Sequence, residues 1–485
     1  MSEAYFVGID IGTQGARVVL LDKRGTPIAS EEEAFLLNGL SRVVQSPTLW
    51  WACCNRLLSV LFESLADDID LSAVKSIAVT STSGTVIPVN KQYEPLYGAI
   101  MYSDPGAADE AALCRQAAQE AGVEGYTGFN TSCGLPKMLW FQKQFPEYTK
   151  EVYKFIHAAD FITGRLCGKY EVTDYTNALK SGYNLHTNQW PAYITGHLGI
   201  PAQWLQQVIP SGKPLEVLDR RLSRKWGLSD TVIITTGITD GCASQIASGA
   251  VSPGQWNTTI GTTMVIKGVT NDEIRDGLGR IYNHRHPDGY WMPGGAGNIG
   301  ADWVSRDFSE RLSELNLLAE ATVPSGAISY PLVQQGERFP FIAPDATGFE
   351  AEGLSLIELF VSKMEGVAYV EKYAFELMEH LSGEQVNTVF TAGGASNSDI
   401  WLRIRANVLN KKICKMKNVS GAVGAAVLAA SGAYYSSLAT AAAAMCRVEK
   451  IVEPQPALVR KYDQYYKRFI LMLQEKKYLG ENIYA

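Results

Sequence analysis

The sequence lacks the cysteine and histidine spacings of a metal-binding or redox protein. Its eight cysteines include no C-x-x-C pair, and its six histidines include no H-E-x-x-H arrangement. Cysteines scattered in this way indicate reduced, mostly buried side chains in a cytoplasmic protein. An apolar strand pattern begins within a few residues of the N-terminus, without the charged and apolar regions of a signal peptide. This also predicts a cytoplasmic location.

The sequence also lacks the charge and the hydropathy of a nucleic-acid or membrane protein. It carries 43 Lys and Arg against 50 Asp and Glu, a net charge of −7, whereas a protein that binds a phosphate backbone favours a basic face. The one long apolar run, residues 421–445, is rich in Ala and Gly and is interrupted by Ser and Tyr. We predict no nucleic-acid or membrane partner, and interpret this run as two close-packed helices buried in the second domain.

The length of 485 residues exceeds the size at which a single core keeps growing, which predicts two domains. No Pro/Gly/Ser-rich or low-complexity linker interrupts the chain. The strand and helix patterns start anew near residues 247–253. We therefore expect domains at 1–250 and 251–485, packed around a central cleft.

Residues 6–30 contain the most informative pattern. An apolar run ends at Asp10, the turn GTQG follows at 12–15, and a second apolar run begins. This pattern is typical of a β-hairpin with polar groups at its tip. Residues 255–269 repeat the strand, a Gly-Thr-Thr turn and the strand, but without the carboxylate. The repeat predicts two related halves that contribute unequally to one ligand site.

Both halves alternate strand and helix patterns. Strand runs unbroken by polar residues indicate a sheet with helices on both faces, and therefore an α/β fold. The patterns predict helices at 47–66, 107–121, 135–145, 301–315 and 355–381, two strands around a turn at 74–89, and strand, turn and helix at 230–250 and 386–410.

The glycine- and threonine-rich turns can present backbone N–H groups and hydroxyls to a phosphate. No G-x-x-x-x-G-K-[ST] sequence is present, so phosphate binding here would not use that loop. Residues 295–300 fit G-x-G-x-x-G, but they lie far from the first strand of a βαβ unit. We interpret them as a glycine bend near a nucleotide or at the start of a helix.

Two acids follow apolar strand patterns. Asp10 ends the first strand, and Asp240 lies between a strand and a helix. An acid before glycine is also a common turn former or N-cap, and this alternative stays open for Asp240. At the carboxyl edge of a sheet a carboxylate can accept a proton from a substrate hydroxyl, as phosphoryl transfer requires. Asp10, beside the turn, suits Mg²⁺ bound through water.

In these residues the chain resembles the FGGY family of carbohydrate kinases, part of the actin/hexokinase/Hsp70 superfamily. The motifs are D-x-G-T at 10–13, TDG at 239–241, IGTT at 260–263, MEGVAY at 364–369 and TAGGASNSDIWLRI at 391–404. Further segments, among them 173–183 and 336–341, resemble the ribulokinase-like pentulose kinases. The resemblance implies an α/β fold of two RNase H-like domains and ATP-dependent phosphorylation of a sugar.

The resemblance also implies roles for the matching residues. Asp240 would be the general base, and Asp10 would help to hold the sugar and, through water, Mg²⁺. Ser83 and Asp104 would contact the sugar together with Asp10 and Asp240. The ATP contacts would come from the two hairpin turns and two glycine bends: Thr13, Gln14, Gly261, Thr262, Thr263, Gly297, Gly393, Gly394, Ala395 and Asn397.

We expect D-ribulose as the first substrate and D-xylulose as the second. Thr82 and Ser83 stand where xylulokinases typically carry Met-His, and the arginine that often follows in the family is missing after Asp104. The alternatives are a kinase for another ketose or polyol, a catalytically idle sugar or nucleotide sensor, and an ATP-driven chaperone-like protein. Retention of Asp240 argues against the sensor, and the absence of a peptide-binding segment after Ala485 argues against the chaperone. A homodimer is common in the family.

Overall fold

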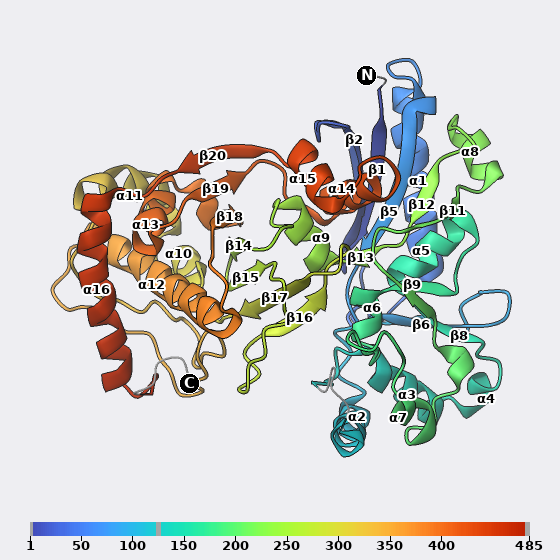
Figure 1. Cartoon of the computed structure of the whole chain (residues 1–485), viewed down its shortest axis with the longest axis horizontal. Coiled ribbons are helices and arrows are strands. Elements are labelled where there is room, and N and C mark those ends of the chain that lie inside the picture. The colour runs from blue at the N-terminus through green and yellow to red at the C-terminus, as the bar shows by residue number, and fades with distance from the viewer. Residues whose placement is uncertain (1–2, 123–127, 481–485) are drawn as a thin grey trace. The chain divides into compact units, whose positions relative to one another are not determined.

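The computed structural model describes residues 3–122 and 128–480, and it divides into two compact units. Unit 1 comprises Met1–Ala247, His284–Gly289 and Asn418–Cys446, and unit 2 comprises Ser248–Asn283, Tyr290–Lys417 and Arg447–Ala485. Each unit contains one large, mixed sheet (Figure 1). Unit 2 begins next to the domain boundary expected from the sequence, but two later segments of the chain belong to unit 1.

The main sheet of unit 1 is built on the predicted hairpin, which the structure confirms. β1 (Tyr5–Ile11) pairs antiparallel with β2 (Gly15–Asp22) and parallel with β5 (Val74–Ser81), and β3 (Pro27–Ala34) extends the sheet beyond β2. On the other side, β5 pairs with β12 (Ile233–Thr235) and, at its carboxyl end, with β13 (Ile238–Thr239). β11 (Pro214–Val217) forms the far edge.

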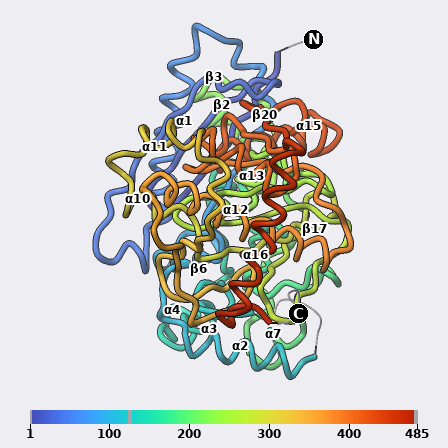
Figure 2. The backbone as a smooth tube through the Cα atoms, turned by 90° about the vertical axis from the view of Figure 1, so that its left-hand side faces the viewer, coloured from blue at the N-terminus to red at the C-terminus, as the bar shows by residue number. Residues whose placement is uncertain are grey.

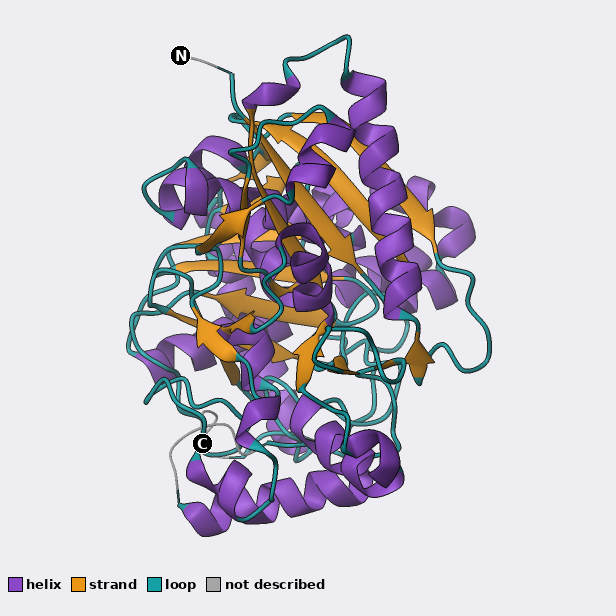
Figure 3. Cartoon of the chain, turned by 90° about the vertical axis from the view of Figure 1, so that its right-hand side faces the viewer, coloured by secondary structure: helices purple, strands orange, loops and turns teal. Residues whose placement is uncertain are grey.

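Helices pack on both faces of this sheet (Figure 3), and they bury β1 and β5 on both sides. α1 (Pro47–Leu65) and α5 (Ala158–Cys167) cover one face, and α9 (Asp240–Ala247) and α14 (Gly421–Ala433) pack together on the other. The predicted helix at 47–66 is confirmed as α1; Ser46 caps its N-terminus by accepting the Leu49 N–H, and Pro47 occupies its first turn.

A second, four-stranded sheet of unit 1 was not predicted. Its order is β4 (Val44–Gln45), β7 (Ala99–Ile100), β6 (Val86–Val89) and β8 (Lys154–His157). The remaining elements of unit 1 are η1 (Leu71–Ala73), α2 (Ala108–Ala121), α3 (Gly134–Gln144), α4 (Pro146–Thr149), β9 (Val172–Asp174), α6 (Tyr175–Leu179), α7 (Ala192–Gly196), η2 (Ala202–Trp204), β10 (Gln207–Ile209), α8 (Arg220–Trp226) and α15 (Leu438–Met445).

The sheet of unit 2 repeats the arrangement of unit 1. β14 (Gln255–Ile260) pairs antiparallel with β15 (Met264–Gly268) and parallel with β18 (Thr388–Ala392), as β1 does with β2 and β5. The strand order is β16 (Tyr282–Arg285), β17 (Trp291–Ala296), β15, β14, β18, β19 (Ile413–Met416) and β20 (Val448–Val452). The internal repeat predicted from the two hairpins is therefore confirmed.

Unit 2 is completed by α10 (Asp302–Asp307), η3 (Ser309–Arg311), α11 (Leu312–Leu318), η4 (Ala319–Thr322), α12 (Leu356–Ser382), η5 (Gly394–Asn397), α13 (Asp399–Leu409) and α16 (Pro456–Glu475). α12, α13 and α16 pack against one another (Figure 2). The prediction of one helix over 301–315 was wrong, because the chain leaves the helix at Phe308. The Phe308 ring is buried there against Trp303 and Phe360.

Residues 421–445 form two helices, α14 and α15, as predicted, but they belong to unit 1 and not to the second domain. α14 lies directly on β1 and β5. A Cβ atom at Gly8 of β1 would overlap the carbonyl oxygen of Ala422, so glycine here lets the helix backbone touch the strand backbone. Among the residues that the structure describes, no helix is long and apolar enough to cross a membrane.

This close approach predicts that Gly8→Ala destabilises the protein. The added methyl group must push α14 away from β1, which costs about 1–3 kcal/mol of unfolding free energy for an overpacked core. The thermal midpoint of the variant, measured by circular dichroism, should fall by several degrees. Gly39→Ala is the matched control because no atom lies within 4 Å of a Cβ built there. Equal midpoints for the two variants would contradict the packing described.

Candidate functional site

The main sheet of unit 1 places Asp10 and Asp240 at one edge. Asp10, near the end of β1, is in register with Thr80 of β5, and Ile238 of β13 pairs with the same Thr80 from the other side. Asp240 follows β13 directly and is the first residue of α9. Its carboxylate accepts a hydrogen bond of 2.6 Å from the Gly241 N–H. The two acids therefore flank the carboxyl end of β5.

The negative charge of Asp10 is poorly compensated. Burial is the largest cause that raises the pKa of Asp10 to about 6, the carboxylate of Asp240 adds to it, and Arg17 partly opposes it. The Asp10 Oδ1 atom is buried and has no hydrogen-bond partner among the described residues. The other oxygen lies so close to the first turn of α14 that a Cβ at Gly421 would overlap it.

These properties fit a hydrated divalent cation near Asp10. A cation would offset the repulsion between the two carboxylates, and a water molecule on the cation could donate to the unpaired Oδ1. Mg²⁺ binds in this way, through few carboxylates and retained water. The donor set of the site therefore fits Mg²⁺.

A cavity of about 1370 Å³ in unit 1 opens beside Asp10 and contains the predicted phosphate turn. Its lining includes Thr13 and Gln14, residues 37–39, 41 and 42, and Tyr102 with Ser103. The turn is held by its backbone, since Gly12 N–H donates to Gly15 O at 3.0 Å and Phe35 N–H donates to Gln14 O at 2.8 Å. The Thr13 hydroxyl donates to the Tyr102 hydroxyl oxygen at 3.4 Å. Tyr102 was not predicted from the sequence as a site residue.

The two remaining sugar candidates, Ser83 and Asp104, also belong to unit 1. The Ser83 Oγ is buried without a hydrogen-bond partner among the described residues, and the next residue, Gly84, packs directly against the Ser132 carbonyl. The Asp104 carboxylate is buried and accepts the Gly106 N–H at 2.8 Å. An unpaired buried hydroxyl and a buried carboxylate are groups that a polyhydroxylated ligand can satisfy.

A fully buried lysine that the sequence analysis missed, Lys137 of α3, lies near Asp104. Its ammonium group donates to the carbonyl oxygens of Thr131 and Cys133. Burial lowers the pKa of Lys137 to about 8, although the charges of Cys133 and Asp104 act in the opposite direction. No periodicity marks a lysine as buried, which is why only the structure could identify it.

In unit 2 the turn Gly261–Thr263 rests on the glycine bend at 297–301. Met264 N–H donates to Ile299 O at 2.6 Å, Gly297 N–H to Met264 O at 2.9 Å, and Ala301 N–H to Gly261 O at 2.7 Å. Thr262 is exposed, and a Cβ at Gly261 would meet no atom within 4 Å. Gly297 is buried and supports the turn through its bond to Met264. Because α10 begins at Asp302, residues 295–300 form a bend before a helix, as interpreted from the sequence.

A buried carboxylate holds this bend in place. Glu337 accepts the N–H groups of Asn298 at 2.6 Å and Ile299 at 3.1 Å, and the Tyr330 hydroxyl donates to it at 3.3 Å. Burial raises the pKa of Glu337, whereas the backbone N–H groups that it accepts act in the opposite direction. Glu337 belongs to the segment 336–341 that the sequence analysis singled out without a role.

The second glycine turn of unit 2, residues 393–397, lies beside the first. Gly393 has a left-handed φ of 89°, and a Cβ there would lie 2.7 Å from the Ile260 carbonyl oxygen. Gly394 and Asn397 are exposed, and a Cβ at Gly394 would meet no atom of the described residues within 4 Å. Ala395, by contrast, points into the core of unit 2. Open space above two neighbouring glycine turns fits a flat, phosphorylated ligand such as a nucleotide.

Comparison with known proteins gives a family match over most of the chain. Residues 5–247 match the N-terminal domain, and residues 256–433 the C-terminal domain, of the FGGY family of carbohydrate kinases. Xylulose kinase of Bacillus subtilis (strain 168) is 27% identical over 491 residues, which cover 94% of each chain. Gluconokinase of Bacillus licheniformis is 24% identical over 455 residues, 88% of this chain and 87% of the relative.

Solved structures have the same fold. That of xylulose kinase from Rhodospirillum rubrum matches with a TM-score of 0.81 at 23% identity and covers 97% of this chain and 98% of its own. The predicted α/β fold with two domains is thereby confirmed.

The buried Lys137 predicts a pH dependence of stability. Between about pH 8 and the unperturbed value of 10.5, the unfolded chain carries the lysine proton and the folded chain does not. The unfolded state then binds more protons, so this group makes the unfolding free energy rise with pH across that window. In Lys137→Met this contribution disappears. The unfolding free energy of wild type minus that of the variant should therefore increase from pH 7.5 to 9.5. Urea denaturation at several pH values measures it; a constant difference would contradict a depressed pKa.

Proposed function

The chain belongs to the FGGY family of carbohydrate kinases, and we propose that the carbohydrate it phosphorylates is a pentulose. Its activity as an ATP-dependent carbohydrate kinase with Mg²⁺ follows from the match to both domains of the family. Finer statements, on the sugar and on the role of each residue, are proposals. The observation that carries them is the pair of acids, Asp10 and Asp240, at the carboxyl end of β5.

In this proposal Asp240 accepts the proton of the terminal sugar hydroxyl as the hydroxyl oxygen attacks the γ-phosphorus. The start of α9 holds the carboxylate at the sheet edge, where a substrate can reach it. ATP with Mg²⁺, when bound, supplies the phosphoryl group and neutralises the charge that develops on it. Asp10 would hold the hydrated metal through its unpaired Oδ1, and Ser83 and Asp104 would bind sugar hydroxyls. Phosphoryl transfer then depends on positioning and electrostatics.

We assign the nucleotide to the glycine turns of unit 2. Gly261, Thr262 and Thr263 would bind phosphate oxygens through N–H and hydroxyl groups. The resemblance implies the same role for Thr13 and Gln14. Gly393, Gly394 and Asn397 would line the adenosine site, since the space above Gly394 is open. The buried positions of Gly297 and Ala395 support these turns from within.

We place D-xylulose before D-ribulose, which reverses the order expected from the sequence. Similarity to proteins named xylulose kinase extends over nearly the whole chain and supports xylulose rather than ribulose. Thr82 and Ser83 remain a departure from the Met-His of typical xylulokinases. The similarity to gluconokinases makes gluconate a second candidate. The cytoplasmic location and a homodimer stay predictions.

ADP release measured against D-xylulose, D-ribulose, gluconate, pentitols and glycerol tests the proposal. Wild type should turn over a pentulose with the highest kcat/KM, and Asp240→Asn should lose about 10²–10⁴-fold in kcat, the usual contribution of a general base. The variant should keep the affinity of wild type for ATP, measured by calorimetry.

The other outcomes are equally informative. Substantial activity in Asp240→Asn would rule out the base assignment, and gluconate or a pentitol as the best substrate would rule out a pentulose. No dependence on any sugar would favour the sensor, and ATP turnover that is equal with and without sugar would favour the chaperone-like alternative.

A further inference from the structure

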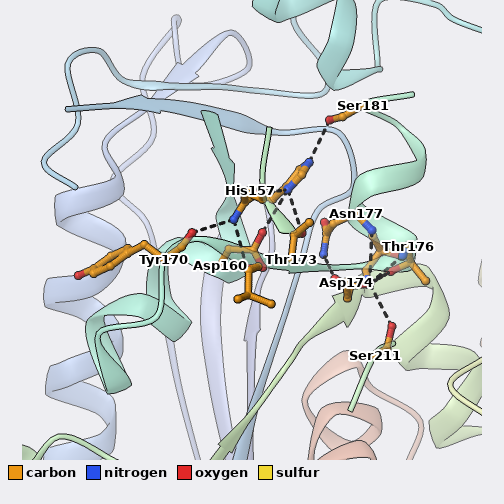
Figure 4. A network of polar contacts seen from close by, with 12 residues as sticks. His157, Asp160, Tyr170, Thr173, Asp174, Thr176, Asn177, Ser181 and Ser211 are labelled. Atoms are coloured by element: carbon orange, nitrogen blue, oxygen red, sulfur yellow. Dashed lines mark hydrogen bonds and ion pairs between the residues drawn. The ribbon is translucent and has the colours of Figure 1, made fainter. Parts of the chain in front are cut away.

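Unit 1 contains a fully buried carboxylate, Asp174, that the proposed mechanism does not use. It ends β9 and caps α6 (Figure 4). Its Oδ1 accepts the Thr176 N–H at 2.8 Å, the Thr176 hydroxyl at 2.6 Å and the Ser211 hydroxyl at 3.0 Å. Its Oδ2 accepts the Asn177 side-chain amide at 2.5 Å. Every one of these partners can donate. Their hydrogen bonds act to lower the pKa of Asp174, whereas burial, the largest cause, and the charge of Asp160 raise it.

This carboxylate fixes the orientation of one hydroxyl group. Because the Thr176 hydroxyl donates its proton to Asp174, only its lone pairs remain for other partners. One of them accepts the backbone N–H of Thr239 at 2.9 Å. Thr239 is the last residue of β13 and directly precedes Asp240. A chain of two hydrogen bonds therefore leads from Asp174 to the residue next to the proposed base.

β13 needs this support because it is very short. The strand has two residues, and among the described residues it pairs with the end of β5 alone. On the β5 side, the Thr80 hydroxyl donates to the Ile238 carbonyl oxygen at 2.7 Å. On the other side, Thr176 accepts the Thr239 N–H. Two side-chain hydroxyls thus hold the backbone from which Asp240 projects.

We propose that Asp174 and Thr176 are positioning residues for the phosphoryl transfer. The Asp174 carboxylate orients the Thr176 hydroxyl, the hydroxyl fixes the backbone at Thr239, and this backbone aims the Asp240 carboxylate at the sugar hydroxyl. The inference rests on the proposed function, since it requires Asp240 to act as the base. It assigns a role to the segment 173–183, which the sequence analysis used only as a point of resemblance.

A neighbouring network provides a control. The His157 ring contacts the Thr173 hydroxyl at 3.1 Å, Asp160 at 3.1 Å and the Ser181 hydroxyl at 3.0 Å (Figure 4). Thr173 is as fully buried as Thr176 and lies on the same segment of chain. Its hydroxyl contacts His157, whereas that of Thr176 contacts the backbone before Asp240. Replacing either threonine with valine removes one buried hydroxyl of the same kind.

The test compares Thr176→Val with Thr173→Val, each measured for kcat, for KM of ATP and for thermal midpoint. Thr176→Val should lower kcat about 10–100-fold, because misplacing a reacting group by about 1 Å costs this much. Its KM for ATP should equal that of wild type. Thr173→Val should keep the wild-type kcat even where its midpoint falls. Thr176→Ser, which retains the hydroxyl, should restore most of the lost kcat.

A purely structural role would lower both midpoints and leave both kcat values alike, and this result would overturn the proposal. So would a kcat of Thr176→Ser as low as that of Thr176→Val. If Thr176→Val does not fold, Asp174→Asn replaces it; the neutral amide is a weaker acceptor for the hydroxyl, so kcat should again fall, and an unchanged kcat would overturn the proposal.

Asp240→Asn, assayed in parallel, distinguishes a failure of the proposed function from a failure of the positioning role. If this variant retains activity, the proposed function of Asp240 fails. If it is inactive while Thr176→Val keeps the full kcat, only the positioning role fails.

Discussion

The burial of Asp10, together with its electrostatic repulsion from Asp240, is the constraint on which the proposed site depends. The two acids flank the carboxyl end of β5, one on β1 and the other after β13. Burial and this repulsion raise the pKa of Asp10 to about 6, and one of its oxygens has no hydrogen-bond partner among the described residues. Such a pair is unfavourable in the free protein and becomes favourable when a cation binds beside it. A site built in this way is suited to a reaction that brings Mg²⁺ with its nucleotide.

Buried polar groups, rather than the sheets alone, place the loops of the proposed site. In unit 1, Asp174 and Thr176 hold the backbone before Asp240. In unit 2, Glu337 holds the bend under the Gly261 turn.

The fully buried Glu371–Arg405 pair supports the second glycine turn of unit 2 in a similar way. Arg405 donates twice to Glu371 and once to the Thr391 hydroxyl, just before the second glycine turn. Breaking such a buried pair costs about 3–5 kcal/mol, because the remaining charge is left uncompensated. In both units, buried carboxylates therefore hold the backbone beside the proposed site.

The sequence was sufficient to predict the hairpins and the position of the two acids at a sheet edge, and insufficient to predict the groups that support them. Asp10 and Asp240 could be predicted because each follows an apolar run, and strand periodicity marks where a sheet edge begins. The role of Asp174 could not, because an acid before a short helix looks like an ordinary N-cap until its burial is known. The Ala/Gly composition of 421–433 indicated close packing, but composition does not tell which strand is the partner. The close approach of the Ala422 carbonyl to Gly8 identifies the partner strand as β1.

The most direct test of the central claim is the affinity of the ADP complex for Mn²⁺, which can replace Mg²⁺ and is counted by electron paramagnetic resonance. Wild type and Asp10→Asn are compared at pH 8 with saturating ADP, after calorimetry has established the ADP affinity of each. If Asp10 holds the metal through water, the variant should bind Mn²⁺ about 10–100-fold more weakly, as outer-shell substitutions do. Equal Mn²⁺ affinity in the two complexes would contradict the account.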